Sequence, residues 1–284
     1  MKVIGYGDNI VDKFLDRRTF YPGGNSVNYA VFAARLGVES EYLGVFGTDD
    51  LGDAMKAALD AEGVQRDHAQ DVEGETGWCS VELRDGDRVF VDWNEGGVTT
   101  SSPLQVDAAL LAHLAEADLV HSGVYGGTAL SMPAVLGVDA LVTYDFSAEP
   151  EFRTDEYLAP FAAGLDLALF SCSEQTEDEI VALLERVSAA GVGLVVATRG
   201  PDGSIAYDGS RVHRQASERV EDTLDTMGCG DAYIASLTTT LLAAGWAKGD
   251  HPAPTLVETA MAEASRYAAA QCRTEGAFGH GVGF

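Results

Sequence analysis

The first part of the chain reads KVIGYG (residues 2–7), NSVNYAVFAARLG (25–37), EYLGVFG (41–47) and LGDAMKAALDAEG (51–63). Short apolar runs, typical of buried strands, alternate here with segments whose apolar residues recur at helical spacing. The alternation continues with the strand-like runs ADLVHSG (117–123), ALVTYDF (140–146), LDLALFS (165–171) and VGLVVAT (192–198). Strands that alternate with helices predict βαβ units and a largely parallel sheet covered on both faces. The sequence therefore predicts a single α/β domain over residues 1–284.

The segment WCSVELRDGDRVFVDW (78–93) departs from this pattern. Apolar and polar residues alternate on both sides of Asp85-Gly86, which predicts a β-hairpin. The hairpin is either an ordinary edge hairpin or a β-lid over a substrate cleft that also offers a dimer surface. Because an amphipathic hairpin needs a partner for its apolar side, we favour a lid formed by about residues 12–22 and 76–98.

Composition excludes several classes of protein. The 284 residues carry a formal net charge of −27, which would repel nucleic acid and anionic membranes. No apolar run is long enough to span a membrane, and the N-terminus lacks a signal-peptide pattern, so we expect a cytoplasmic protein. The four cysteines are scattered and the histidines lack metal-ligand spacing, which predicts reduced thiols and no zinc site.

The acidic residues are dispersed along the chain, and only four residues are lysines. An acid excess with scarce lysine resembles proteins from organisms with a salt-rich cytoplasm, where salt screens the self-repulsion of the surface. We favour this halophilic interpretation over that of a merely acidic bacterial enzyme.

The stretch DTMGCGDAY (225–233) places two glycines and an aspartate at the start of a predicted helix. A helix N-terminus presents unpaired backbone N–H groups, and glycine leaves them open to an approaching anion. Gly228 and Gly230 therefore predict a phosphate site, and Asp231 could accept a proton from an attacking hydroxyl. The alternative is that Asp231 merely caps the helix.

A second glycine pair opens the helix in YPGGNSVNYAVFAARLG (21–37). Asn25 and Asn28 lie one turn apart, so both amides can face one cleft and hydrogen-bond a polyhydroxylated ligand. Asp8 and Asp12, at the end of the first strand, are candidates to accept sugar hydroxyls, although solvated loop carboxylates would look the same in sequence.

Together, PGGNSVNYAVFAARLG and DTMGCGDAYIASL resemble the two signatures of the ribokinase-like (PfkB-type) carbohydrate kinases. GVFGTDDLG, SCSE, TRGPDGS and EGA fit the family in order. The resemblance implies a three-layer α/β/α sandwich with a mostly parallel sheet and a small β-sheet lid. It also implies an ATP-dependent sugar kinase that uses Mg²⁺, and a monovalent cation such as K⁺ is a further candidate. A non-catalytic sugar- or nucleotide-binding regulator is the rival, but the intact GxGD motif argues against it.

Within the family, the chain is similar to fructoselysine kinases in GDNIVD, YPGGNSVNYAV, VELRDGDRVF, YDFS and DTMGCGD. This similarity implies phosphorylation of the 6-hydroxyl of a fructosamine or another fructose-like substrate. Another ketose, a nucleoside or a keto-sugar acid remains the alternative substrate.

The resemblance also implies roles for individual residues. Asp231 would be the catalytic base, with the amides of Gly228, Cys229 and Gly230 as the anion hole. The sugar would contact Asp12, Gly24, Asn25 and Asn28. Apart from the resemblance, Asp8 at the end of the first strand and the lid residues Arg88 and Trp93 are further candidates, and for each lid residue we favour the alternative of plain surface placement. The nucleotide would lie along Thr198, Gly200, Gly203, Thr226 and Gly228.

The chain departs from the family pattern at two places. The family's Asn-x-x-Glu corresponds here to Ser171 and Glu174, so Glu174 would serve the hydrated metal without the Asn contribution. Cys229 stands where the family usually has Ala. A thiol at a helix N-terminus can have a lowered pKa and be open to oxidation, but we favour the alternative of a small buried residue without a chemical role.

Overall fold

A computed structural model describes residues 1–84 and 87–284, without the side chains of residues 83–90. The predicted hairpin turn at Asp85-Gly86 and the Arg88 side chain therefore lie outside the described residues.

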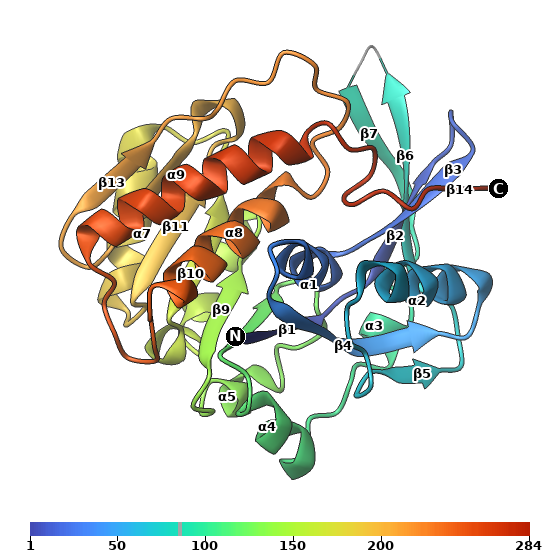
Figure 1. Cartoon of the computed structure of the whole chain (residues 1–284), viewed down its shortest axis with the longest axis horizontal. Helices are drawn as coiled ribbons and strands as arrows, with labels where there is room; N and C mark the ends of the chain where they lie inside the picture. Colours follow the sequence, from blue (N-terminus) through green and yellow to red (C-terminus); the bar gives the residue numbers. More distant parts are fainter. Residues whose placement is uncertain (85–86) are drawn as a thin grey trace.

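The central layer is a nine-stranded sheet in the order β13-β12-β11-β10-β9-β8-β1-β4-β5 (Figure 1). All neighbouring strands from β11 to β5 run parallel, and β12 and β13 complete one edge as antiparallel strands. The strands span β1 (Lys2–Gly7), β4 (Glu39–Gly47), β5 (Gln70–Val72), β8 (Leu119–Gly123), β9 (Leu141–Asp145), β10 (Leu167–Ser171), β11 (Leu194–Thr198), β12 (Ser204–Tyr207) and β13 (Val212–Gln215).

Alternate residues of the central strands enter two hydrophobic clusters, one on each face of the sheet. On β11, for example, Leu194 and Val196 belong to one cluster, whereas Val195 and Ala197 belong to the other. Because successive side chains of a strand point to opposite faces, strands buried on both sides read as continuous apolar runs. The apolar runs in the sequence thus have a direct structural cause.

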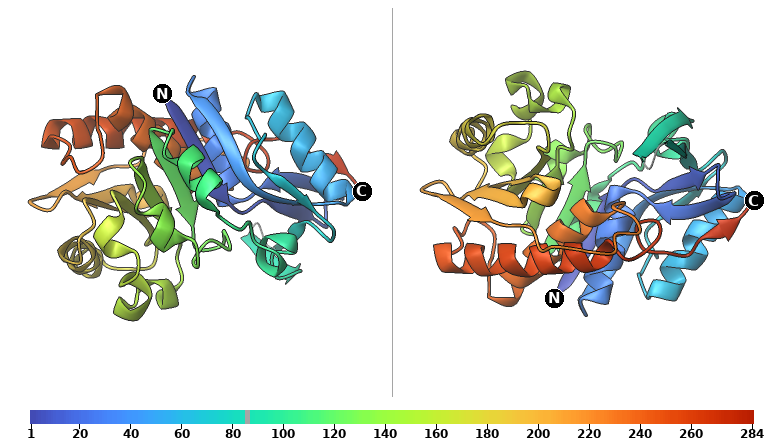
Figure 2. Two further views of the ribbon diagram at one scale, coloured as in Figure 1. Left: turned by 90° about the horizontal axis from the view of Figure 1, so that it is seen from below. Right: turned by 90° about the horizontal axis from the view of Figure 1, so that it is seen from above.

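Helices cover both faces, which confirms the predicted three-layer sandwich (Figure 2). One face carries α1 (Asn25–Arg35), α2 (Asp50–Glu62), α8 (Cys229–Ala243) and α9 (Pro254–Gln271). The other carries α4 (Ala108–Leu114), α5 (Met132–Val135), α6 (Asp155–Leu158) and α7 (Glu177–Ala189), with α3 (Val98–Ser101) close by. The short 3₁₀ segments are η1 (Pro150–Arg153), η2 (Ala162–Gly164) and η3 (Gly200–Asp202).

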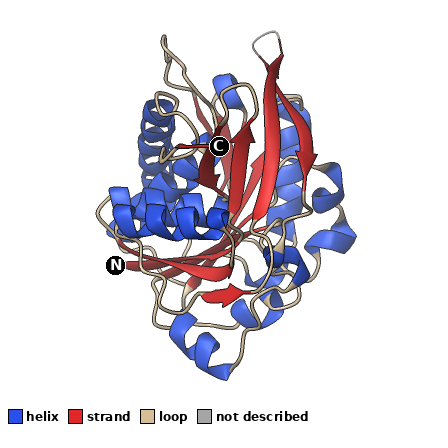
Figure 3. Ribbon diagram, turned by 90° about the vertical axis from the view of Figure 1, so that its right-hand side faces the viewer, coloured by secondary structure: helices blue, strands red, loops and turns tan. Residues whose placement is uncertain are grey.

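A second sheet of five strands projects to one side of the first, in the order β14-β3-β2-β6-β7 (Figure 3). Its strands are β2 (Ile10–Phe14), β3 (Thr19–Gly23), β6 (Gly77–Arg84), β7 (Asp87–Trp93) and β14 (Val282–Gly283). Phe14, Tyr21 and Val81 form its small apolar core. The two segments expected in a lid thus share one sheet, but the sequence did not indicate that the C-terminal β14 would pair with β3.

Among the described residues, no helix is both long enough and apolar enough to cross a membrane.

Candidate active site

The candidate site lies where the parallel strands of the central sheet end. Asp8 follows β1, and Asp145 is the last residue of β9. Ser171 and Thr198 end the neighbouring strands β10 and β11 and pair with each other in register. Ligands of open α/β sheets bind beyond this carboxyl edge, so the sheet brings residues from distant parts of the sequence to one place.

The N-terminus of α8 faces this edge. Gly228 precedes the helix in the left-handed conformation, with φ 72°, and a Cβ there would lie 2.8 Å from the Cβ of Ala277. Both observations require glycine at this position. At Gly230, by contrast, a Cβ would meet no atom within 4 Å. Packing within the chain therefore does not explain this second glycine, and the space beside it lets a ligand approach the start of the helix.

Asp231, in the first turn of α8, is buried and held by two amides from α1. Asn25 Nδ2 donates to Asp231 Oδ1 at 3.1 Å, and Asn28 Nδ2 donates to Oδ2 at 2.7 Å. Asn28 Oδ1 is itself buried without a hydrogen-bond partner within the described part of the chain. The structure thus joins the two glycine-rich motifs at one carboxylate and leaves an acceptor available for a ligand hydroxyl.

Asp145 completes this group, although no motif in the sequence marks it. Asn25 Nδ2 donates to Asp145 Oδ2 at 3.0 Å as well as to Asp231, so one amide bridges two carboxylates. The backbone N–H of Ser147 also donates to Asp145, at 2.7 Å. The signal in the sequence is that Asp145 comes directly after the apolar run LVTY. Asp8 has the same kind of position after the apolar run KVIGYG.

Burial and mutual repulsion raise the pKa values of these carboxyls. Burial raises the pKa of Asp231 well above its ordinary value; Asn28 lowers it, and Asp145 and Asp8 raise it further. Burial likewise raises the pKa of Asp145 to about 6. Carboxylates that share a low-dielectric site resist simultaneous ionisation, which makes each of them a stronger proton acceptor.

Asp8 caps the N-terminus of α1. Its oxygens accept from the backbone N–H groups of Asn25 at 2.8 Å and Ser26 at 3.1 Å, and from the Ser26 hydroxyl at 2.9 Å. Gly24, the N-cap residue, has φ 105°, and a Cβ there would lie 3.0 Å or less from atoms of Asp8, Asn9 and Ile10. Asp8 and Gly24 therefore fix the start of α1, and their contact with a sugar stays a prediction.

The second sheet places one row of residues beside the site. Asp12 on β2 pairs with Cys79 on β6, which pairs with Trp93 on β7. Residues paired in this way project from the same face of a sheet. The thiol of Cys79 donates to Asp12 Oδ1 at 2.9 Å, and Trp93 is 61% exposed.

The residues predicted to bind the nucleotide lie near the ends of β10 and β11 or just before α8. Thr198 ends β11, and Gly200 begins the turn that follows. Gly203 has φ 89°, and a Cβ there would lie 2.0 Å from the carbonyl oxygen of Gln215, so the fold itself requires this glycine. Thr226 accepts from the Cys229 amide at 3.3 Å. Glu174 is exposed in the loop after β10.

Cys229 has a partner that the sequence did not indicate. Its Sγ lies 3.1 Å from that of Cys272, which follows α9. The hydrogen bond from Cys229 lowers the pKa of Cys272 to about 7, whereas the same contact, together with burial, raises the pKa of Cys229. The lowered pKa considered for Cys229 from its place at a helix N-terminus does not take account of this contact, which acts in the opposite direction.

Comparison with known proteins decides the family. The model of the pfkB family of carbohydrate kinases matches residues 8–144 and 157–279. The chain belongs to this family. As a pfkB-family member it is an ATP-dependent sugar kinase, and the predicted resemblance is confirmed.

Two relatives of this pfkB-family kinase share more than a third of its sequence. It is 36% identical over 282 residues to the fructosamine kinase FrlD of Bacillus subtilis (strain 168), which covers 99% of this chain and 94% of the relative. It is also 36% identical over 244 residues to the fructoselysine 6-kinase of Escherichia coli (strain K12), which covers 86% of this chain and 88% of the relative.

Solved structures support the ribokinase-like fold. The ribokinase of Arabidopsis thaliana, complexed with ribose and ATP, has a TM-score of 0.73 at 20% identity, covering 95% of this chain and 90% of its own. A double mutant of the fructokinase of Vibrio cholerae, with fructose, ADP and potassium ion bound, has a TM-score of 0.74 at 21% identity, covering 97% and 93%.

Proposed function

We propose that this kinase transfers the γ-phosphoryl group of ATP to the 6-hydroxyl of a fructosamine or a closely related fructose derivative. The names of its relatives, a fructosamine kinase and a fructoselysine 6-kinase, support this substrate class. The observation that carries the proposal is the position of Asp231, which lies in the first turn of a glycine-flanked helix and accepts hydrogen bonds from two amides.

In this proposal Asp231 accepts the proton of the attacking hydroxyl. Asn25 and Asn28 each donate to one oxygen of the carboxylate, which fixes its orientation and leaves a further lone pair on each oxygen for the substrate. The raised pKa of Asp231 suits a proton acceptor. Asn28 Oδ1, which lacks a partner among the described residues, would accept from a second sugar hydroxyl.

The amides of Gly228, Cys229 and Gly230 would hold the negative charge that develops on the transferred phosphoryl group. The open space beside Gly230 gives a phosphate room to approach. The Cys229 amide donates to Thr226 only at 3.3 Å, a long hydrogen bond that a phosphate oxygen could replace.

ATP would lie along the ends of β10 and β11, near Thr198, Gly200 and Gly203. Glu174 fits a hydrated Mg²⁺, because its carboxylate is exposed in the loop after β10 and Mg²⁺ is usually held by carboxylates and water. When bound, Mg²⁺ supplies positive charge against the phosphates. Activation by K⁺ stays a prediction from the family resemblance.

The second sheet would act as the lid. Asp12 and Trp93 project from one face of it, where they would contact the sugar and help to exclude water. An amino-acid tail on the substrate offers a carboxylate that Arg88 could bind. Dimerisation through this sheet also stays a prediction.

A substrate panel tests the proposal. ADP release is measured with fructoselysine, other fructosamines, fructose, ribose and nucleosides, with ATP and Mg²⁺, and in KCl against matched NaCl. We expect the highest kcat/KM for a fructosamine and phosphorylation at its 6-hydroxyl, checked by phosphorus–proton NMR. Preference for unmodified fructose, ribose or a nucleoside, or a product phosphorylated elsewhere, would overturn the proposed substrate.

A further inference from the structure

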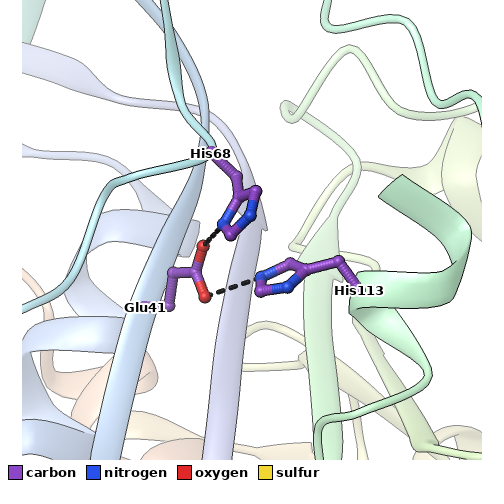
Figure 4. Close-up of side chains that lie close together, drawn as sticks. All are labelled: Glu41, His68 and His113. Carbon is purple, nitrogen blue, oxygen red and sulfur yellow. Dashed lines mark hydrogen bonds and ion pairs between the residues drawn. The ribbon is translucent and has the colours of Figure 1, made fainter. Parts of the chain in front are cut away.

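A second group of ionisable side chains lies away from the candidate active site. Glu41 comes from β4, His68 from the segment before β5, and His113 from the last turn of α4 (Figure 4). Glu41 Oε1 lies 2.8 Å from His68 Nδ1, and Glu41 Oε2 lies 2.8 Å from His113 Nε2. Each residue offers one potential ligand atom, and these three atoms lie within 4.8 Å of one another.

The group sits toward the edge of the sheet opposite to the kinase site. Glu41 pairs with Ile4 in β1, whereas Asp8 comes four residues later, just after the last residue of that strand. At about 3.3 Å per residue, the separation along the strand is about 13 Å. The proposed phosphoryl transfer therefore does not use these side chains.

Glu41 is a buried anion. Its side chain is only 2% exposed, and the Lys2 ammonium lies 3.2 Å from Oε2. Burial alone would raise the pKa of Glu41, but the hydrogen bonds from His68, His113 and Lys2 outweigh burial and lower it. A buried carboxylate that keeps its charge needs cationic or hydrogen-bonding partners, and here two of them are imidazoles.

We propose that Glu41, His68 and His113 form a binding site for a divalent transition-metal ion of the zinc class. Two imidazoles and one carboxylate are a common ligand set for zinc. Ligands at about 2.0–2.1 Å from a tetrahedral ion lie about 3.3 Å apart, and the three atoms here, within 4.8 Å of one another, can reach this spacing by rotation of their side chains.

The two imidazole rings must turn for this purpose. Their centroids lie 3.6 Å apart with an interplanar angle of 31°, and a metal ion must lie close to the plane of each ring. The side chain of His68 is 44% exposed and has room to rotate. Because His68 is half-exposed, water could occupy the fourth coordination position of the ion.

The Lys2 ammonium lies 3.2 Å from Glu41 Oε2 and competes with a metal ion for this carboxylate. A metal ion bound to Glu41 would repel this ammonium, so Lys2 must move away from the carboxylate when the metal binds. Removal of this charge should therefore strengthen metal binding. The bound ion would tie β4, the segment before β5 and α4 together.

Metal titration tests the proposal. The full chain, stripped with a chelator and free of nucleotide, is titrated with Zn²⁺ by equilibrium dialysis, and Tm is measured with and without the metal. We expect one high-affinity zinc per chain and a higher Tm, because a ligand that binds only the folded state stabilises it. Absence of high-affinity zinc binding would overturn the proposal.

Variants locate the site. His68→Gln, at a half-exposed position, should weaken zinc binding at least about tenfold and remove the Tm shift, whereas Lys2→Met should tighten binding. His251→Gln at an exposed position outside the group, and Cys272→Ser in the thiol pair, are matched controls and should bind as the wild type does. The site is wrong if His68→Gln binds zinc normally, if Cys272→Ser abolishes binding, or if Lys2→Met fails to tighten it.

Discussion

Asn28 Nδ2 donates to Asp231 Oδ2 at 2.7 Å and so links the start of α1 to the start of α8, which lies 203 residues later in the chain. Because Asn25 holds the other oxygen, the carboxylate is fixed from both sides. The two glycine-rich motifs, each ambiguous alone, therefore belong to one site.

Asp231→Asn should lower kcat by about 10²–10⁴-fold, because the amide cannot accept the hydroxyl proton. ATP binding, measured by calorimetry, should be largely retained. Asp178→Asn, at an exposed position of α7, is the matched control and should leave kcat unchanged. A kcat for Asp231→Asn within tenfold of the wild type would contradict the role of Asp231 as base.

Asn28→Ala should shift the pH dependence of kcat/KM. Asp231 must be ionised to act as base, so activity falls as the pH drops through its pKa. The hydrogen bond from Asn28 lowers that pKa, and its loss should raise it further, moving the acidic limb to higher pH. If Asn28 affects the chemical step only through Asp231, kcat of the double variant should be no lower than that of Asp231→Asn, and loss of the proposed contact between Asn28 Oδ1 and the sugar should appear as a higher KM. An unmoved acidic limb would argue against this coupling.

Gly230→Ala separates catalysis from folding. A Cβ at Gly230 meets no protein atom within 4 Å, so Tm should be unchanged or slightly raised, since alanine favours a helix. The methyl group would occupy the approach of the phosphate, so kcat should fall by about tenfold or more. Gly228→Ala provides the contrast: it should lower Tm, because φ is 72° and the new Cβ would meet Ala277. Full activity in Gly230→Ala would refute the anion hole.

Asp145→Asn should stabilise the kinase at neutral pH. Folding raises the pKa of Asp145 to about 6 from 3.8, so the folded state binds the proton more tightly than the unfolded state. The stability that this pKa shift contributes is fully present below the pKa of Asp145 in the unfolded state, and it is lost as the pH rises through about 6. A pKa shift of about two units corresponds to a loss of at most about 3 kcal/mol in the free energy of unfolding at pH 7.5. The neutral amide of Asn carries no such cost, so the variant should be more stable by up to this amount.

Urea unfolding checks this prediction. The gain in Asp145→Asn over the wild type should be present at pH 7.5 and should shrink toward pH 4, where the wild-type carboxyl is protonated. A gain that does not depend on pH would mean that burial of the charge is not its cause.

Much of the fold could be predicted because its signals are local. The apolar runs of β1, β9, β10 and β11 mark strands buried on both faces, and the glycine pairs mark the starts of α1 and α8. In contrast, β14 has only two residues, too few for a recognisable pattern, and joins its sheet only through pairing with β3.

The unpredicted side-chain groups arise from tertiary contacts. In the sequence, His68 lies 27 residues and His113 lies 72 residues after Glu41. Cys272 lies 43 residues after Cys229. No motif spacing therefore reveals either group. Asp145 was missed for a different reason. Its position after a strand is visible in the sequence, but only burial and the shared Asn25 amide distinguish it from a solvated acid.

The thiols of Cys229 and Cys272 should form a disulfide under peroxide. Their sulfurs lie 3.1 Å apart, and a bond of about 2.05 Å needs an approach of about 1 Å. The pKa of Cys272 is about 7, so it supplies the thiolate that peroxide oxidises to a sulfenic acid. The Cys229 thiol then displaces water from this sulfenic acid and forms the disulfide. Peptide mapping should locate this bond, and titration should show the loss of two free thiols.

Formation of this disulfide should lower kinase activity by about tenfold or more, because it displaces Cys229 at the start of α8, where a shift of about 1 Å is costly for catalysis. A thiol reductant should restore the activity. Cys272→Ser should keep its activity in peroxide, whereas Cys172→Ala, which removes a buried thiol outside the pair, should remain as sensitive as the wild type. Oxidation that joins Cys229 to Cys272 without loss of activity would show that the amides at the start of α8 tolerate the displacement, and equal inactivation of Cys272→Ser would place the sensitive group elsewhere.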